Sequence, residues 1–195
     1  MAENKIKYGL KNVYFATLSY DTTGAPVFAT PVAFPGAVSL DLSAEGDRTP
    51  FYADNIEYWV GNINNGYSGS LEMARITDDF RKKVLGEIVD NKGILVEDMN
   101  APAVHFALLF QFEGDDKATR HVLYNCTAGR PSAGSETKGE SIDPKTESVD
   151  ISASSIYCSA ISKEIVKAST TDGSDSTTYN GWFSAVYVPA GLPTP

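Results

Sequence analysis

The sequence contains little cysteine and little histidine. Its 195 residues include two cysteines, Cys126 and Cys158, and two histidines, His105 and His121. Two cysteines do not make the disulfide framework of a small secreted domain, and both lie in strand-like patterns, so we expect buried, reduced thiols. The histidines flank a predicted hairpin turn at Gly114, but no third ligand follows at a recognisable spacing. We therefore predict no metal site.

Long apolar runs and an excess of basic residues are also missing. No stretch approaches the ~20 apolar residues that cross a bilayer, and the N-terminal stretch MAENKIKYGLKNVYFA has no signal-peptide core. There are 16 Lys and Arg against 25 Asp and Glu, which gives a net charge of −9. This balance disfavours binding to nucleic-acid phosphates and to an anionic membrane surface. We expect a protein that folds in a cytoplasm and binds neither a membrane nor DNA.

Catalytic motifs are absent from the sequence as well. It has no phosphate-binding G-x-x-x-x-G-K-[ST] loop, no dinucleotide-binding G-x-G-x-x-G and no catalytic-serine G-x-S-x-G. Residues 135–138 match S-x-x-K without its companion motifs, and residues 172–175 lack the Glu that completes a calcium loop. We predict no enzyme activity and no cofactor.

Alternation of apolar and polar residues with a period of two is abundant, and it predicts strands. Strands are expected at 37–45, 67–76 and 148–154, with Val38, Leu40 and Leu42 facing the core. The stretch 104–112 is apolar at nearly every position, which is typical of a strand covered on both faces. Its expected hairpin partner is 118–127, and further strands are expected at 13–20, 27–30 and 181–188. The outward faces of the first three strands are small, polar and partly acidic: Ser39, Asp41, Ser43, Ser70, Glu72, Asp150 and Ser152.

One short helix is predicted after Thr77, whose side chain can cap it. Asp78 and Asp79 place negative charge at its N-terminus, and Phe80 and Val84 form an apolar face that must dock on a sheet. Polar loops are expected at 128–146 and 168–178, and an N-terminal arm at 1–12. The chain is predicted to be a single domain, 1–195, with a mainly β fold: an antiparallel β-sandwich or open barrel with one short flanking α-helix.

The segment 46–66 is rich in aromatic residues and asparagine, and we expect a long loop. Aromatic side chains are enriched at protein–protein interfaces, which predicts contact with neighbouring subunits. The alternative is that about half of these rings pack on the subunit's own core, and the two interpretations are compatible. The predicted contact residues are Phe51, Tyr52, Asn55, Tyr58, Trp59, Asn65 and Tyr67.

Long blocks of the sequence, in order, resemble the major tail protein of long-tailed bacteriophages, in the phi13-type group. The resemblance covers nearly the whole chain and is weakest over 161–180. It is carried by GLKNVYFA at Gly9, PVAFPGAVSLDLSAEGD at Pro31, PFYADN at Pro50, NNGYSGSLEMA at Asn64, DDFRKKVLGE at Asp78, FALLFQFEGDDKATRHVLYNCTAGRPS at Phe106 and WFSAVY at Trp182.

The resemblance implies a structural virion protein of the tail, assembled in the host cytoplasm. Six copies would form a ring, the rings would stack into a tail tube, and phage DNA would pass through the tube into the host. The implied partners are further copies of the chain, a tape-measure protein, a tail terminator and tail chaperones, and DNA would transit without specific binding. On this basis the acidic strand faces are expected to line the lumen; an outer, solvated face is the alternative.

Two other functions fit parts of the sequence. The inner tube protein of a contractile injection system would share the fold and the hexamer. A monomeric β-sandwich that binds carbohydrate could use Tyr58, Trp59 and Trp182 as a stacking platform.

Overall fold

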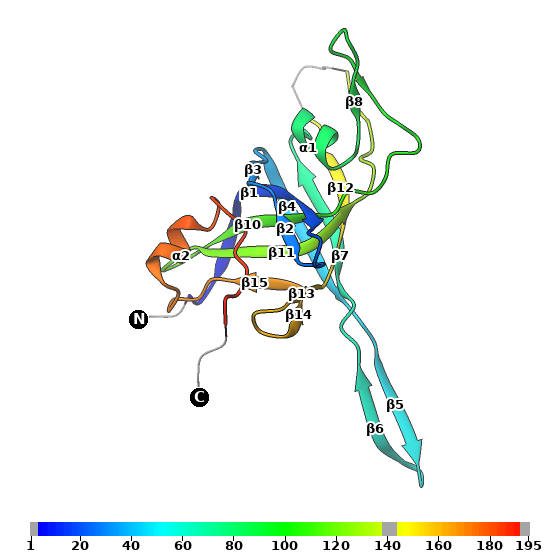
Figure 1. Ribbon diagram of the computed structural model, residues 1–195, viewed down its shortest axis with the longest axis vertical. Helices are drawn as coiled ribbons and strands as arrows, with labels where there is room; N and C mark the ends of the chain where they lie inside the picture. Colours follow the sequence, from blue (N-terminus) through cyan, green and yellow to red (C-terminus); the bar gives the residue numbers. More distant parts are fainter. Residues whose placement is uncertain (1–3, 138–143, 192–195) are drawn as a thin grey trace.

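An antiparallel sheet forms the body of the protein (Figure 1). The computed structural model describes residues 4–137 and 144–191, and in these residues the sheet contains nine strands. Most of them follow the order β2-β1-β10-β11-β12-β7-β4, while β3 pairs with β1 and β15 pairs with β11. The strands are β1 (Lys7–Tyr20), β2 (Pro26–Phe28), β3 (Val32–Ala33), β4 (Ala37–Glu45), β7 (Gly66–Met73), β10 (Phe106–Gly114), β11 (Thr119–Ala128), β12 (Glu147–Ser154) and β15 (Lys167–Ser169).

Three small two-stranded sheets and two short helices complete the described part of the chain. The pairs are β5 (Arg48–Ala53) with β6 (Ile56–Asn62), β8 (Ile88–Val89) with β9 (Leu95–Val96), and β13 (Ile156–Cys158) with β14 (Lys163–Ile165). The helices are α1 (Asp78–Lys83) and α2 (Ser176–Gly181). Neither helix is long and apolar enough to cross a membrane, a finding that covers the described residues only.

The strand pair β10–β11 lies at the centre of the molecule and is covered on both faces, as the sequence predicts. On one face, Phe106 and Leu108 pack with residues of β1, β4, β7, β12 and α1 in the larger apolar cluster. On the other face, Ala107 and Leu109 pack with Trp182 and the C-terminal segment in a second cluster. Because successive side chains of a strand point to opposite faces, one strand contributes to both clusters.

The sheet folds over its own larger cluster. Leu40 on β4 and Leu71 on β7 pack into the same cluster as Phe15 on β1 and Phe106 on β10, although β4 and β1 stand far apart in the strand order. The sheet is therefore layered on itself, and the predicted mainly β, antiparallel sandwich is confirmed. Cys126 and Cys158 are both buried free thiols, as predicted.

Helix α1 follows the sequence prediction closely. The Thr77 side chain caps it by accepting a hydrogen bond from the Phe80 amide at 3.4 Å. The Phe80 ring is fully buried and stacks on Phe34 with ring centroids 4.5 Å apart. Val84 is buried as well. The helix is only six residues long, so these aromatic contacts hold it on the sheet.

The expected strand at 181–188 is wrong. A second helix, α2, begins after Asp175, whose carboxylate accepts a hydrogen bond from the Thr178 amide at 2.8 Å. Residues 182–191 have no helix or strand, although Trp182 is 3% exposed and its indole N–H donates to the His121 carbonyl at 3.2 Å. The apolar residues of 181–188 are spaced as in a strand. Their spacing arises because their side chains cover one face of β10–β11.

Three further expectations need correction. The predicted arm 1–12 contains the start of β1 at Lys7, and its residues 1–3 lie outside the described residues. The predicted polar loop 168–178 is shorter than expected, because β15 extends to Ser169 and α2 begins at Ser176. In the predicted loop 128–146, residues 138–143 lie outside the described residues. Val38 is 49% exposed because the β4–β7 register shifts between Ala37 and Ser39, so Ala37 packs on the core instead.

Candidate functional site

The segment 46–66 is a β-hairpin that projects from the body, which corrects the expectation of a loop (Figure 1). Its turn consists of Asp54 and Asn55, with φ angles of 51° and 59°. Two consecutive residues with positive φ are typical of the two-residue turn that joins tightly twisted strands, and Asp and Asn tolerate this conformation. At its base, the Ile63 amide donates to the Asp47 carbonyl at 3.1 Å.

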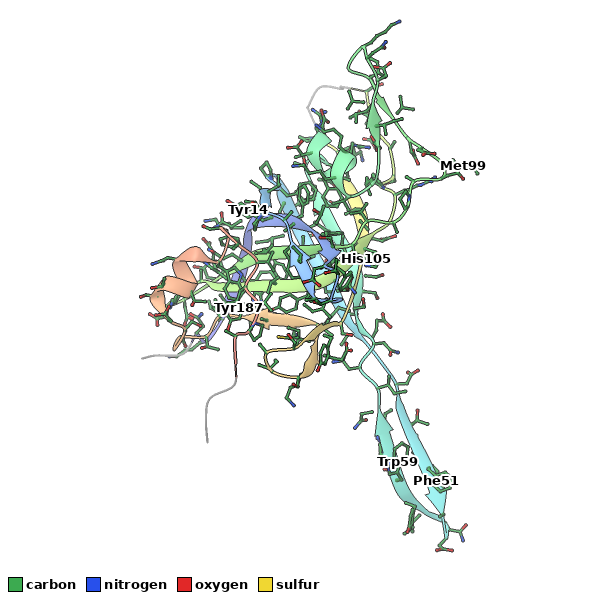
Figure 2. All side chains as sticks on the ribbon, in the orientation of Figure 1. Tyr14, Phe51, Trp59, Met99, His105 and Tyr187 are labelled. Carbon is green, nitrogen blue, oxygen red and sulfur yellow. The ribbon has the colours of Figure 1, made fainter. Side chains whose placement is uncertain are left out.

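The large side chains of this hairpin are exposed. Phe51 is 58% exposed, Tyr52 62%, Tyr58 70% and Trp59 59%. Phe51 and Trp59 are direct cross-strand partners, and Figure 2 shows both near the far end of the hairpin. A Cβ atom at Gly61 would stand 2.6 Å from the Trp59 ring, so the absence of a side chain lets the indole lie along the strand. None of these four rings packs on the subunit's own core.

Two of the predicted contact residues lie elsewhere. Tyr67 is in β7, opposite Ala44 and Ala153, and packs partly against the larger apolar cluster. Its ring also lies 4.4 Å from the Lys167 ammonium group. Asn65 lies at the base of the hairpin, where its amide donates to the Glu45 carbonyl at 2.8 Å, while Asn55 is in the turn. The two strands of the hairpin and its turn thus contain Phe51, Tyr52, Asn55, Tyr58 and Trp59, whereas Asn65 lies at the base and Tyr67 lies in β7.

An isolated two-stranded hairpin is marginally stable in water, because it has no third layer to cover its side chains. Within the described residues, β5 and β6 pair only with each other, so each strand has one unpaired edge. Unpaired edges next to large apolar side chains are suited to pairing with another chain. The sequence carried a signal for this hairpin: the turn residues Asp54-Asn55 lie between the adjacent aromatic pairs Phe51-Tyr52 and Tyr58-Trp59.

The predicted polar strand faces form one continuous surface. The order β12-β7-β4 places Asp150, Ser70 and Asp41 in one row. Since directly paired residues point to the same face of a sheet, the neighbouring rows share this surface. These rows are Ser148–Glu72–Ser39 and Ser152–Ser68–Ser43, so the structure brings together all seven predicted residues and adds Ser68 and Ser148.

Glu72 is held in its ionised form on this polar surface. Hydrogen bonds from the Thr146 and Ser39 hydroxyls lower the pKa of Glu72, and the Ser39 bond is 2.9 Å long. The opposite face of the same strands is apolar, with Leu71, Val149 and others in the larger cluster. The surface therefore carries hydroxyl groups and carboxylates only, a composition that attracts neither apolar side chains nor phosphate groups.

The two histidines lie apart: His105 directly precedes β10, and His121 is in β11. His105 bonds to Asn125, with 2.6 Å between Nδ1 and Oδ1. His121 is stacked on Phe110 with ring centroids 5.1 Å apart, and burial, assisted by Lys167 and Lys7, lowers its pKa to about 4. No group of three His, Cys, Asp or Glu side chains with the geometry of a metal site occurs in the described residues.

The carbohydrate platform suggested by the sequence is wrong. Trp182 is 3% exposed and packs beneath the C-terminal segment, whereas Tyr58 and Trp59 are on the projecting hairpin. The three rings therefore do not share a surface. The sequence pattern could not separate these rings, because aromatic residues are common in both cores and interfaces.

A second segment, residues 87–103, also projects from the body and is not among the predicted contact residues (Figure 1). It contains β8 and β9 and exposes several apolar side chains, and Met99 stands on its outer side in Figure 2. The sequence ILVEDMN places three apolar residues and a methionine beside two acidic residues. The exposed residues are Ile88, Val89, Ile94, Val96 and Met99.

The fold is similar to that of a protein among the solved structures. No protein-family model matches the sequence, and no curated protein matches it. A chain of the anti-feeding prophage (AFP) baseplate, solved by cryo-electron microscopy with 6-fold symmetrisation, is 10% identical with a TM-score of 0.43. The alignment covers 87% of this chain and 97% of that chain. At this identity and TM-score, the likeness leaves the function of this chain open.

Proposed function

We propose that this chain is a structural subunit of a phage tail tube. Six copies form a ring, rings stack into a hollow tube, and DNA passes through the tube without specific binding. The tape-measure protein, the tail terminator and tail chaperones are the other partners, and the mature protein resides in the virion. The sequence blocks described above support the family, and the geometry of the β5–β6 hairpin supports self-assembly.

The exposed hairpin is the observation that carries this proposal. Burial of a large apolar side chain contributes about 1.5–3 kcal/mol, and the hairpin exposes four aromatic rings. More than half of each ring stays exposed in the single subunit, so a contact with another molecule would bury apolar surface that the fold leaves in water. A contact between the hairpin of one copy and a different surface of the next is head-to-tail, and such contacts propagate into filaments.

The free edge of β4 supports ring formation. In the described residues β4 pairs only with β7, and it ends the path of the nine-stranded sheet. An exposed strand edge is a site for aggregation unless it is covered or paired. Closure of a ring would cover the β4 edge of each subunit with its neighbour and bring the polar rows of all copies to the inner side.

The polar rows support passage of DNA. Asp41, Glu72 and Asp150 present carboxylates on a surface otherwise made of serine hydroxyls. Negative charge on the wall of a channel repels DNA phosphates, so the molecule is not retained as it moves. We propose that this surface lines the lumen of the tube.

Removal of the hairpin tests the assembly proposal. Residues 48–62 are replaced by Asn-Gly, which joins the hydrogen-bonded pair of Asp47 and Ile63 by a tight turn. We expect a folded monomer that forms no tubes in negative-stain electron microscopy, while the wild-type chain forms hollow tubes when concentrated.

A milder pair of variants separates contact from folding. Phe51→Ser/Trp59→Ser removes two hairpin rings, and Tyr20→Ser/Tyr157→Ser removes two exposed rings outside the hairpin. Only the first variant should lose assembly. Normal tubes from the hairpin-replaced chain would refute the proposal, as would equal loss of assembly in both serine variants.

A charge-reversal variant tests the lumen. We expect tubes of Asp41→Lys/Asp150→Lys to retain a fluorescent DNA duplex at low salt and to release it as salt rises, because Lys–phosphate contacts are salt-dependent. Wild-type tubes and tubes of the control Asp116→Lys/Asp172→Lys should retain little. Equal retention by the two lysine variants, measured by anisotropy, would place the polar rows outside the channel.

A further inference from the structure

A cavity of about 320 Å³ lies at one end of the larger apolar cluster, between β4 and the β10–β11 pair. Its walls include Leu40 and Leu42 from β4, and Phe110 and Phe112 from β10. The volume is at the lower end of the range of pockets that hold small ligands or side chains. An apolar side chain inserted here would contact aromatic and aliphatic groups on two sides.

The rim of this cavity carries two lysines. Lys7 lies with its ammonium group 5.5 Å from the centre of the Phe112 ring, and the Lys167 ammonium lies 4.4 Å from the centre of the Tyr67 ring. Among the described residues, neither lysine has an ion-pair partner. Asp41 is the one acidic residue among the described residues that line the cavity.

His121 also lines the cavity and adds no positive charge near neutral pH. Burial and the two lysines lower its pKa to about 4. The cavity therefore combines apolar walls with a rim that has a small excess of positive charge. The chemistry that fits it is an apolar side chain next to a carboxylate.

The chain displays this combination at the turn that follows β9. Met99 is 85% exposed, the most exposed of the large apolar side chains in the described residues. It directly follows Asp98, whose carboxylate accepts a hydrogen bond from the Asn100 amide at 2.9 Å and whose carbonyl accepts one from the Ala101 amide at 3.2 Å. The side chain of Met99 is thus presented on an ordered turn. Methionine adapts readily to irregular apolar cavities.

Arg130 holds this turn in place and does not neutralise Asp98. Its guanidinium forms an ion pair with Glu97 at 3.0 Å and donates to the Met99 carbonyl at 3.4 Å. Asp98 has no ion-pair partner among the residues that the structure describes. The turn therefore carries one unpaired carboxylate beside one exposed apolar side chain.

We infer that Met99 of one copy docks into this cavity of a second copy, with Asp98 against Lys7 and Lys167. The turn and the cavity are different surfaces, so the contact is head-to-tail and leaves a free turn and a free cavity at its two ends. The inference rests on the proposed self-assembly in one respect, namely that the molecule whose Met99 enters the cavity is a second copy of this chain. It is separate from the contact assigned to the β5–β6 hairpin.

Photo-crosslinking tests this contact in the full-length chain. The three methionines are replaced by photo-methionine, a diazirine analogue of similar size, and unlabelled protein is mixed with a ¹⁵N-labelled copy before irradiation. We expect crosslinks between copies that join Met99 to peptides containing Leu40–Leu42 or residues 110–123, and loss of these crosslinks in Met99→Leu.

Charge variants complete the test. Lys167→Glu should lower the crosslink yield by about fivefold, the change expected for one partly exposed ion pair. Lys163→Glu, which changes an exposed lysine on β14, should leave the yield within about twofold, and adding Asp98→Lys to Lys167→Glu should restore it.

Several results would overturn the inference: crosslinks that map to other surfaces or to another protein, equal yields from the two lysine variants, or no capture of a second copy at any concentration. Electron microscopy of the same samples distinguishes failure of the Met99 contact from failure of the tube proposal. Tubes with crosslinks elsewhere would refute the Met99 contact alone, and crosslinks in the cavity without tubes would refute the tube alone.

Discussion

The hairpins β10–β11 and β5–β6 have the same local structure and opposite surroundings. In β10–β11, the paired residues Leu108 and Leu123 are both buried, and both faces of the pair are covered by apolar clusters. In β5–β6, the paired residues Phe51 and Trp59 are both more than half exposed. Apolar side chains stabilise the subunit where other layers cover them, as in β10–β11. Where no layer covers them, as in β5–β6, they leave apolar surface that the proposed assembly would bury.

Matched Phe→Ala substitutions should give the largest difference between the two hairpins. Phe106→Ala removes a fully buried ring that contacts Phe80, with ring centroids 5.7 Å apart, and should lower the free energy of unfolding by about 3–5 kcal/mol. Phe51→Ala should change it by less than about 0.5 kcal/mol, because the ring is already in water. Urea denaturation of the monomer measures both. Similar losses from the two variants would mean that the hairpin packs on its own subunit in solution.

The second difference concerns pH. The pKa of His121 in the folded chain is about 4, below its ordinary value of 6.5, so the unfolded chain takes up the proton first. Stability should therefore fall as the pH drops from about 6.5 to 4, and this loss should stop below the folded pKa. After a discount for partial exposure, we expect His121→Phe to lose about 1–2 kcal/mol of this dependence.

Glu57 provides the matched control on the exposed hairpin, where it pairs with Arg48. Glu57→Gln should leave the pH dependence nearly unchanged, because exposed ion pairs contribute little. Urea midpoints at pH 7 and pH 4.5 measure both variants. An undiminished acid dependence in His121→Phe would show that other groups cause it.

Sequence patterns were informative where burial imposes a strict period. The continuous apolar stretch of β10 indicated a strand covered on both faces, and the alternation in β4, β7 and β12 placed seven polar residues on one surface. Thr77 and Phe80 identified α1 because a cap and a buried ring are local features. These elements follow from residues close in sequence, so no tertiary information was needed.

The remaining features depend on contacts between distant residues. Trp182 and the apolar residues after it are spaced as in a strand. This spacing arises because they lie across β10–β11, a contact between distant residues that no local pattern predicts. Val38 faces solvent because of a register shift with β7. The hairpin at 46–66 was read as a loop because Asp54 and Asn55 form a turn more often built with glycine. The proposed docking of Met99 into a cavity involves two surfaces that are distant in the sequence, so no local pattern predicts it.

The two tryptophans allow the most direct measurement of the central claim, which is that the exposed hairpin becomes buried when copies meet. Trp182→Phe leaves Trp59 as the one tryptophan of the chain. In the monomer, acrylamide should quench its fluorescence efficiently, because Trp59 is 59% exposed. In the assembled particle, we expect a blue-shifted emission and quenching reduced several-fold. Assembled particles in which Trp59 is quenched as efficiently as in the monomer would contradict it.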